Sequence, residues 1–520
     1  KGRNGGVFWV APRTRDIPFL EKFLDKELPN ISYTVAHGQL PVKKLEQRIS
    51  EFYDRKVPIL ISTNIIESGL DLPNVNTIII HRANMFGLSQ LHQLRGRVGR
   101  SANKRGYAYL TYQKETNESV QLHVVRHRAW SNEKPPVFVL AGGPGQAATE
   151  MTHMLNTAFK EVKKQHDIVF VAQRGSGLSN AQSCRVPQTN DIPTVTQAMQ
   201  ACQPVIKPIE EQLSTDTLAR DIEWVRKSLG YSSIHLWGGS YGTFAAQHYA
   251  ATFPVTVQSL VLDAAVALDG NPLVAGNRYP QQSLERLDSI CQQDQYCSTQ
   301  FPDWKNGLDT LLTNAELSPM SISYNGQEMQ LDRHSIASLV RTSLYSPEWA
   351  ARLPLAVTTA LQGDTRIFGT LNSMILDTFN SSMYVGLTLG VLCQEHVYDG
   401  QEELASEAGE HTFVGDSYYQ FWLSACGSER IAQADYITTP KSLSMPTLLI
   451  SGTLDPITPE QSAEQALSYL TNAQHIVIPN ASHTNSGRGC MPKLLNEFFV
   501  TGGVSDATCI TSHQFPPFML

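Results

Sequence analysis

Hydrophobic residues along the first 80 positions recur in short runs separated by stretches with helical spacing. The runs predict buried strands at residues 6–11, 33–36, 57–62 and 77–81, and the intervening spacing predicts helices at residues 16–28 and 42–53. Strands that alternate with helices are typical of a parallel sheet covered by helices on both faces. The N-terminal part of the chain is therefore predicted to be an α/β unit.

The pattern starts again after Val120 with a second set of elements. Strands are predicted at residues 120–130, 137–140, 168–172, 234–237, 446–451 and 474–478, and helices at residues 214–229 and 243–252. Residues 266–443 have helical periodicity and separate the fourth of these strands from the last two. The remainder of the chain thus reads as a second α/β unit with a long helical insertion.

Charge divides the chain at the same place. Up to Glu115 there are 18 Lys and Arg against 10 Asp and Glu, a net charge of +8. The remainder has 41 − 18 = 23 basic and 48 − 10 = 38 acidic residues, a net charge of −15. A basic first part fits weak binding to a polyanion such as DNA. The acidic remainder argues against nucleic acid there, and fits either a cationic ligand or a solvated surface.

Cysteine is confined to the second part, where all eight residues lie. An even number in one segment suggests disulfides and an oxidising compartment, with reduced buried thiols as the alternative. Cys291 with Cys297, and Cys490 with Cys509, are the candidate pairs.

The chain begins at Lys1 without a signal peptide and has no apolar run near the ~20 residues that cross a bilayer. As it stands it would be cytoplasmic and apart from membranes, although the second part resembles an exported protein in its cysteines.

The N-terminal part carries motifs of a nucleic-acid motor. VAHGQL (35–40), STNIIESGLDLPN (62–74), MFGLSQLHQLRGRVGR (85–100) and GYAYLTY (106–112) resemble the second RecA-like domain of superfamily 2 helicases, in the group of transcription-repair coupling factors and RecG-type proteins. The resemblance spans about residues 1–115. It implies roles in nucleotide and DNA contact for Thr63, Gly69 and Asp71 (motif V) and for Gln93, Arg97 and Arg100 (motif VI). Arg97 and Arg100, three residues apart, would be the arginine fingers.

The phosphate-binding half of such a motor is missing from the sequence. Nucleotide is held mainly by a G-x-x-x-x-G-K-[ST] loop in a preceding RecA-like domain, and no such loop occurs in the 520 residues. Two arginines without this cradle predict no independent ATPase. ATP and Mg²⁺ would bind only if a first RecA-like domain were supplied.

The second part contains GGSYG at Gly238–Gly242, between a predicted strand and a predicted helix. This context indicates a nucleophile elbow, which exposes the hydroxyl of Ser240 at a sharp strand-to-helix turn. Serine needs a base oriented by an acid, in the chain order Ser, Asp, His for this fold. Asp455 in GTLDPITP and His483 in PNASH each follow a predicted strand, so the three are predicted to form a triad. The amides of Tyr241 and Gly143, the latter in AGGPG, are the expected oxyanion donors.

GGPG, QRGSGLS, GGSYG, GTLDPITP and ASH followed by RGC are similar to motifs of α/β-hydrolases of the prolyl and tripeptidyl aminopeptidase group. The resemblance covers about residues 120–503 and implies a serine peptidase with a helical cap. It departs from the group at Ala141, where His is usual, and at Ala172, where Asp is usual. Residues 1–117 are then a RecA-like domain, 118–265 and 444–520 the hydrolase core, and 266–443 the cap.

Glu395, in VLCQEH, stands out as an acid within an apolar stretch of the predicted cap. By analogy with acidic cap residues in relatives, we expect it to bind the free N-terminal amine of a peptide substrate. The hydrolase part calls for no cofactor or metal. The favoured hypothesis is a serine exopeptidase, with an esterase using the same residues, or a DNA-translocase fragment carrying the hydrolase as a passenger, as alternatives.

Overall fold

The structure is a computed structural model of the whole chain. The residues that it describes are 5–38, 40–63, 75–81, 83, 91, 94, 106–113, 119–130, 134–184, 186–187, 192–324, 326–397, 401–427 and 442–519. None of the described helices is long and apolar enough to span a membrane.

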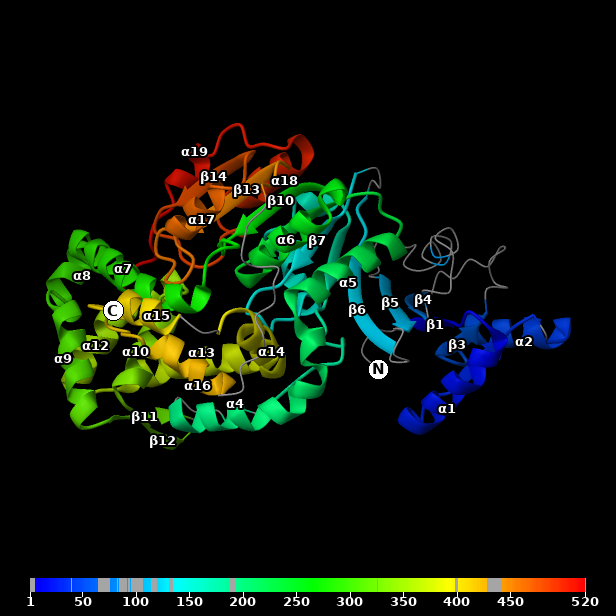
Figure 1. Cartoon of the computed structure of the whole chain (residues 1–520), viewed down its shortest axis with the longest axis horizontal. Coiled ribbons are helices and arrows are strands. Elements are labelled where there is room, and N and C mark those ends of the chain that lie inside the picture. The colour runs from blue at the N-terminus through cyan, green and yellow to red at the C-terminus, as the bar shows by residue number, and fades with distance from the viewer. Residues whose placement is uncertain are drawn as a thin grey trace.

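One twelve-stranded sheet runs through the described part of both halves of the chain, in the order β14-β13-β10-β9-β7-β8-β6-β5-β4-β1-β3-β2. Its strands are β1 (Gly6–Val10), β2 (Tyr33–Ala36), β3 (Ile59–Ser62), β4 (Val75–Ile80), β5 (Gly106–Gln113), β6 (Ser119–His127), β7 (Val137–Leu140), β8 (Ile168–Val171), β9 (Ile234–Gly239), β10 (Val257–Asp263), β13 (Thr447–Gly452) and β14 (Ala473–Ile478). Figure 1 shows the N-terminal part at one end of the molecule and the cap at the other.

Strand β6 is the junction between the two halves. It pairs antiparallel with the whole of β5, with Tyr109 opposite His123, and antiparallel with β8 on its other side. The strands beyond β5 and beyond β8 are parallel to their neighbours. The rings of Tyr109 and His123 stack with centroids 5.0 Å apart. Strand β5, which belongs to the N-terminal part, thus covers an edge of the sheet of the second part that would otherwise be open.

Alternate residues along the central strands supply two separate hydrophobic cores. Phe138, Leu236 and Leu262 face one side with helices α5 (Thr215–Ser228), α6 (Tyr241–Thr252) and α17 (Glu460–Leu467). Val139, Trp237 and Val261 face the other side with α18 (Met491–Thr501). This division follows from the two-residue period of a strand, and both faces are buried, as the apolar runs in the sequence predict.

The N-terminal part has its own two cores on the same sheet. Helix α1 (Ile17–Glu27) packs on the face of Trp9, and α2 (Val42–Tyr53) packs on the face of Phe8. Trp224 of α5 contacts the core that contains Phe8 as well as the hydrolase core, so side chains as well as strands join the two parts.

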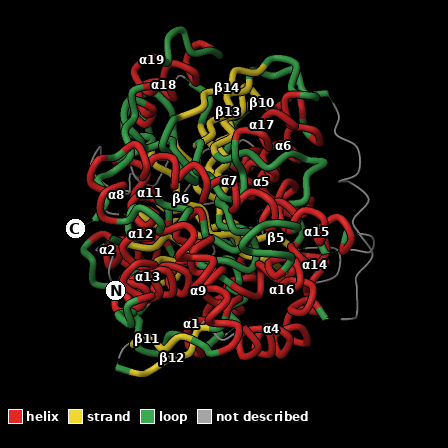
Figure 2. The backbone as a smooth tube through the Cα atoms, turned by 90° about the vertical axis from the view of Figure 1, so that its left-hand side faces the viewer, coloured by secondary structure: helices red, strands yellow, loops and turns green. Residues whose placement is uncertain are grey.

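The cap lies between β10 and β13 and has a hydrophobic core of its own. Its elements are α7 (Pro272–Gln293), α8 (Gln295–Gln300), α9 (Trp304–Leu317), the hairpin β11 (Met320–Tyr324) and β12 (Gln327–Leu331), α10 (Arg333–Ser343), α11 (Pro347–Ala350), α12 (Leu353–Leu361), α13 (Arg366–Ser382), α14 (Val385–Glu395), α15 (Glu402–Gly409) and α16 (Ser417–Cys426). Helix α4 (Ile192–Ile206) packs against α14 and α16, so a segment from before β9 also joins the cap (Figure 2). The expected boundary at residue 266 therefore omits this earlier segment.

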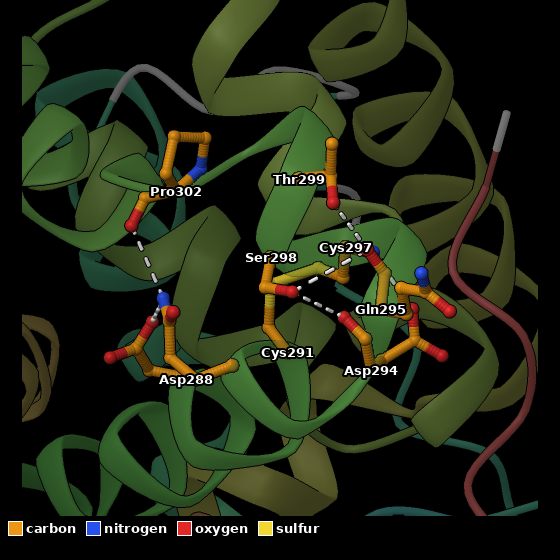
Figure 3. The surroundings of a disulfide bond; sticks show 9 residues. Asp288, Cys291, Asp294, Gln295, Cys297, Ser298, Thr299 and Pro302 are labelled. Atoms are coloured by element: carbon orange, nitrogen blue, oxygen red, sulfur yellow. Dashed lines mark hydrogen bonds between the residues drawn. A yellow bond between two sulfur atoms is a disulfide. The ribbon is translucent and has the colours of Figure 1, made fainter.

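All eight cysteines are paired. The structure joins Cys291 to Cys297 and Cys490 to Cys509, the two pairs considered from the sequence, and also Cys184 to Cys202 and Cys393 to Cys426. Figure 3 shows the first pair at the turn between α7 and α8, where Asp294 accepts a hydrogen bond from the amide of Cys297 at 2.7 Å. This side-chain cap begins α8 directly after the end of α7.

The pairing of β5 with β6 can be tested by removing one backbone donor from β5. The amide and the carbonyl of His123 bond Ser179 and Ala172 on the β8 side, so the neighbouring pair of Ala108 and Val124 carries the bonds between β5 and β6. Proline at Ala108 therefore deletes a ladder hydrogen bond to β6, at an expected cost of about 1–3 kcal/mol. The midpoint of thermal inactivation of the hydrolase should then fall by roughly 2–4 °C per kcal/mol. Thr34→Pro, in β2 at the far edge of the sheet, is the matched control and should leave that midpoint in place. Equal shifts for both variants would contradict a stabilising junction.

Candidate active site

Ser240 lies at a sharp turn between β9 and α6. Its backbone has φ 54° and ψ −124°, a region that non-glycine residues rarely adopt. Its amide donates to the carbonyl of Asp263 at 2.9 Å, and its carbonyl accepts from the amide of Thr243 at 2.8 Å. The strained turn places the side chain at the N-terminus of α6, where the helix dipole favours negative charge.

Two glycines of the GGSYG motif are required by the close approach of backbone atoms. A Cβ at Gly238 would lie 2.2 Å from the carbonyl oxygen of Gly242, and a Cβ at Gly242 would lie 2.3 Å from that of Leu140. Both distances are far below van der Waals contact, and the obstructing atoms belong to backbone that cannot rotate away. The geometry is therefore that of a nucleophile elbow.

Asp455 and His483 form a directly bonded pair. The Nδ1 atom of His483 lies 2.8 Å from Oδ2 of Asp455, which is fully buried. The other carboxylate oxygen accepts from the amides of Ile457 and Thr458 at 3.0 and 2.9 Å, and the hydroxyl of Thr458 donates to Oδ2 at 2.7 Å. These bonds fix the orientation of the carboxylate, which in turn fixes that of the imidazole.

The pKa values of this pair move apart. Burial alone would raise the pKa of Asp455, but the neighbouring His483 and the two amides outweigh it and hold that pKa below its ordinary value. Burial opposes the charged form of His483, yet the carboxylate of Asp455 outweighs it and raises the imidazole's pKa. The pair therefore favours an ionised acid beside a base that accepts a proton readily.

Asp263, at the end of β10, ties the nucleophile loop to the histidine loop. Its carbonyl holds the amide of Ser240, and its buried carboxylate accepts from the amides of Asn485 and Ser486, each at 2.7 Å. Sequence reasoning missed this role, although an acid at the end of a buried strand is a usable signal. Ser240 and His483 consequently line the same cavity.

No hydrogen bond joins the hydroxyl of Ser240 to the imidazole of His483 within the described part of the chain. Such bonds are often long without substrate and tighten in the reacting complex. A second contact, with Tyr345 of the cap, positions the imidazole. The ring of Tyr345 lies 4.9 Å from that of His483 in an edge-to-face arrangement, and its carbonyl accepts from the amide of His483 at 3.3 Å.

The expected oxyanion donors lie at the same cavity. Gly143 and Tyr241 both line it, together with Gly142. A Cβ at Gly142 would be 3.2 Å from Cβ of Ser240, so the AGGPG loop packs directly against the nucleophile. Two loops that carry backbone N–H groups therefore flank Ser240, as an oxyanion hole requires.

The cavity has a volume of about 1350 Å³ and is enclosed by the core, the cap and α4. Much of its lining is apolar, with Met154, Phe244 and Trp422 among its larger side chains. Charged side chains are few, and Glu150, Arg341 and Asp416 are the ones outside the triad and Asp263 that the described residues contribute. Within the described residues, no group of acidic, Cys or His side chains could hold a metal ion.

Glu395 does not line the cavity, which corrects the expectation that it binds a substrate amine. It is fully buried, and its two carboxylate oxygens accept bonds from the amide and the hydroxyl of Thr215, both at 2.6 Å. Thr215 begins α5, so the carboxylate caps the positive end of that helix. The hydroxyl of Thr215 also bonds the hydroxyl of Tyr241 at 2.7 Å. Glu395 therefore links α14 of the cap to Thr215 of α5 and, through Thr215, to Tyr241 beside Ser240.

Most of the residues implied for the motor part lie outside the described residues: Gly69, Asp71, Gln93, Arg97 and Arg100. Thr63 is described, and it is buried directly after the end of β3. Its place at the carboxyl end of a parallel strand is where ligands of open α/β sheets bind.

Comparison with known families assigns the two parts. A model of the α/β hydrolase fold matches residues 135–486, and the chain belongs to that family. A model of the helicase conserved C-terminal domain matches residues 1–102. The chain therefore joins a helicase C-terminal domain to an α/β hydrolase.

The N-terminal part is similar to transcription-repair-coupling factors. That of Rickettsia bellii is 56% identical over 109 residues, which are 21% of this chain and 10% of that protein. A chloroplastic ATP-dependent DNA helicase of Arabidopsis thaliana is 50% identical over 110 residues, 21% of this chain and 13% of that protein. The chain thus spans only about a tenth of the length of these relatives.

Solved structures similar to the second part include a proline iminopeptidase of Mycobacterium smegmatis and a thermophilic esterase of Thermogutta terrifontis. The first is 13% identical with a TM-score of 0.36 and covers 74% of this chain and 95% of its own. The second is 16% identical with a TM-score of 0.33 and covers 76% and 96%. At these scores neither likeness carries an argument about substrate.

The bond between Asp455 and His483 predicts a pH dependence. If His483 is the base, it must be neutral to accept the proton of Ser240, so kcat/KM should fall as the pH drops through a pKa above the ordinary 6.5. Asp455→Asn removes the charge that raises this pKa. The acidic limb of the plot of kcat/KM against pH should therefore move to lower pH, while kcat falls by about 10⁴-fold. Asp269→Asn, an exposed carboxylate away from the triad, should change neither. A pH profile measured on an activated ester checks this, and an unmoved limb in Asp455→Asn would contradict the pairing.

Proposed function

We propose that the chain is a serine exopeptidase of the aminopeptidase type. Ser240 attacks the scissile carbonyl, His483 accepts its proton and returns it to the leaving amine, and Asp455 holds the imidazole. The amides of Tyr241 and of the AGGPG loop, with Gly143 as the first candidate, stabilise the tetrahedral oxyanion. The observation that carries the proposal is the elbow at Ser240 in one cavity with His483, which is bonded to the buried Asp455.

Recognition of a free amine requires a carboxylate at the cavity, and we propose Asp416 for this role in place of Glu395. Asp416 lines the cavity directly before α16, and its carboxylate has no hydrogen bond or ion pair to any described residue. Glu150, the other carboxylate outside the triad region, already accepts from the hydroxyl of Tyr384 at 2.7 Å. Asp416 is half-buried and also lines a smaller open pocket beside Glu407 and Glu410, so its negative charge favours a cationic partner.

An esterase with the same triad is the second candidate, because a mainly apolar cavity also suits an acyl chain. An aminopeptidase needs a substrate with a free N-terminal amine, and an esterase does not. An esterase would hydrolyse a substrate with a blocked N-terminus as well as one with a free N-terminus.

The decisive assay compares aminoacyl-p-nitroanilides that have a free or an acetylated N-terminus. The free amine should give the higher kcat/KM in the wild-type chain, and Ser240→Ala should abolish turnover of both. Asp416→Asn should raise KM for the free amine by roughly 10- to 100-fold, the size expected for a charge-assisted hydrogen bond. Glu403→Gln, an exposed acid on α15, is the matched control. Equal turnover of free and blocked substrates would favour the esterase.

For the N-terminal part we propose that it neither hydrolyses ATP nor unwinds DNA by itself. The second RecA-like domain contributes arginines to a site whose phosphate cradle is absent from the sequence. Its net charge of +8 up to Glu115, counted from the sequence, supports weak and salt-sensitive binding to duplex DNA.

Purified full-length chain should accordingly show no ATP turnover, with or without duplex DNA. Filter binding to the same duplex should be detectable at low salt and lost at moderate salt, because counterion release weakens each phosphate contact. The Ser240→Ala chain serves as the control, since the triad has no part in either measurement. DNA-stimulated release of phosphate would overturn this proposal.

A further inference from the structure

Helix α10 of the cap presents a polar face to the active-site cavity. His334, Ser338, Arg341 and Thr342 line it; Ser338 follows His334 by four residues and precedes Arg341 and Thr342 by three and four, which places them on one side of the helix. Tyr345, just beyond the end of the helix, continues this line to the triad histidine. Arg341 is the only residue of this face with a permanent charge.

Arg341 differs from the other buried arginines among the described residues. Arg126, Arg174 and Arg226 are each paired with a carboxylate, those of Asp167, Asp221 and Glu223. Arg341 is equally buried, with 8% of its surface exposed, but no described carboxylate lies within ion-pair distance of it. A buried charge without a counter-ion is costly, so its retention at a cavity wall points to a ligand.

Two tyrosines hold the guanidinium without neutralising it. Its central carbon lies 4.1 Å from the ring centroid of Tyr418 and 5.6 Å from that of Tyr345, and Nη1 donates to the hydroxyl of Tyr345 at 3.2 Å. The two aromatic faces offset part of the free-energy cost of removing the guanidinium from water, and they fix the plane of its N–H groups. The guanidinium is thus held in one orientation before a ligand binds, and its positive charge remains available to an anion.

The position of Arg341 relative to the triad tells which part of the substrate it meets. Tyr345 lies between the guanidinium and the imidazole of His483, with its ring in contact with both. His483 returns its proton to the leaving amine, so the leaving fragment lies on the side of this imidazole. Arg341 is therefore on the leaving-group side of the cavity.

We propose that Arg341 binds a carboxylate on the leaving fragment of the substrate. A planar guanidinium matches a carboxylate through two parallel hydrogen bonds, which a neutral amide cannot reproduce. The carboxylate is either the free C-terminus of a short peptide or an acidic side chain next to the scissile bond. This inference rests on the proposed peptidase function, and it narrows the substrates to peptides with an anion close behind the cleaved bond.

The test compares matched peptides that differ only in that charge. Pro-Ala and Ala-Ala-Pro-Ala are offered as free acids and as C-terminal amides, and a third set of amides carries Glu in place of the last Ala. The wild-type chain should prefer an anionic peptide over its neutral amide by roughly 10- to 100-fold in kcat/KM. Preference for the free acids alone identifies the C-terminus, and rescue of the amides by Glu identifies the side chain.

Variants assign the preference to Arg341. In Arg341→Met the ratio of anionic to neutral peptide should fall toward one, and in Arg341→Lys it should be intermediate, because the charge remains without the fork. Arg366→Gln, an exposed arginine paired with Asp364, removes the same charge elsewhere and should keep the wild-type ratio. Each ratio is internal to one protein, so partial loss of folded Arg341→Met does not alter it.

Binding separates this inference from the proposed function. Calorimetry on the full-length Ser240→Ala chain measures affinity for the same acid and amide peptides without turnover. If the free-acid peptides bind more tightly than the amides but the wild type cleaves neither, the peptidase proposal is wrong and the carboxylate site at Arg341 stands. Equal affinity and equal cleavage of acids and amides would overturn the carboxylate site and leave the peptidase standing.

Discussion

Asp263 is the residue on which the candidate active site depends, because it bonds both the loop of Ser240 and the loop of His483 from the end of one central strand. Its backbone carbonyl accepts from the amide of Ser240, and its carboxylate accepts from the amides of Asn485 and Ser486. Burial raises its pKa, while those amides favour its charged form. A carboxylate that accepts hydrogen bonds from two amides of a neighbouring loop is satisfied internally and supports the loop, so it is not itself a reacting group. The separation of nucleophile and base is thereby set by the sheet and not by flexible chain.

The same sheet explains how two unrelated segments can form one folded unit. Strand β6 has a free side in the hydrolase alone, and β5 of the helicase segment fills it with a full antiparallel ladder. Hydrogen bonds between backbones do not require matched side chains, so a strand from an unrelated protein segment can pair with the open edge of a sheet. Trp224, which packs on the cores of both segments, adds side-chain contact to the ladder. The charge and cysteine distributions differ between the two segments.

Features set by local pattern could be predicted from the sequence, and features set by tertiary packing could not. The strand before GGSYG, the helix after it and the turns that carry Asp455 and His483 each follow from short-range signals, and the structure pairs the latter two. Glu395 shows the limit, because an acid within an apolar stretch indicates burial but does not reveal its partner, which is Thr215, 180 residues away. Arg341 and Tyr345 gave no signal at all, since the cavity-facing side of a cap helix is defined only by the helices around it. The extension of the cap to α4 was missed for the same reason.

The link between Glu395 and Thr215 acquires meaning from the rest of α14. Near its start, the amide of Tyr384 and the hydroxyl of Thr388 donate to the carbonyls of Gly145 and Pro144 at 2.9 and 2.8 Å, in the loop expected to supply one oxyanion amide. At its end, Glu395 reaches Tyr241, the expected second donor, through the hydroxyl of Thr215. One cap helix therefore braces both loops that flank Ser240. Because oxyanion stabilisation depends on donors held in place before reaction, displacement of α14 would alter both donors together. The cap on this side of the cavity thus holds both loops beside Ser240 in place.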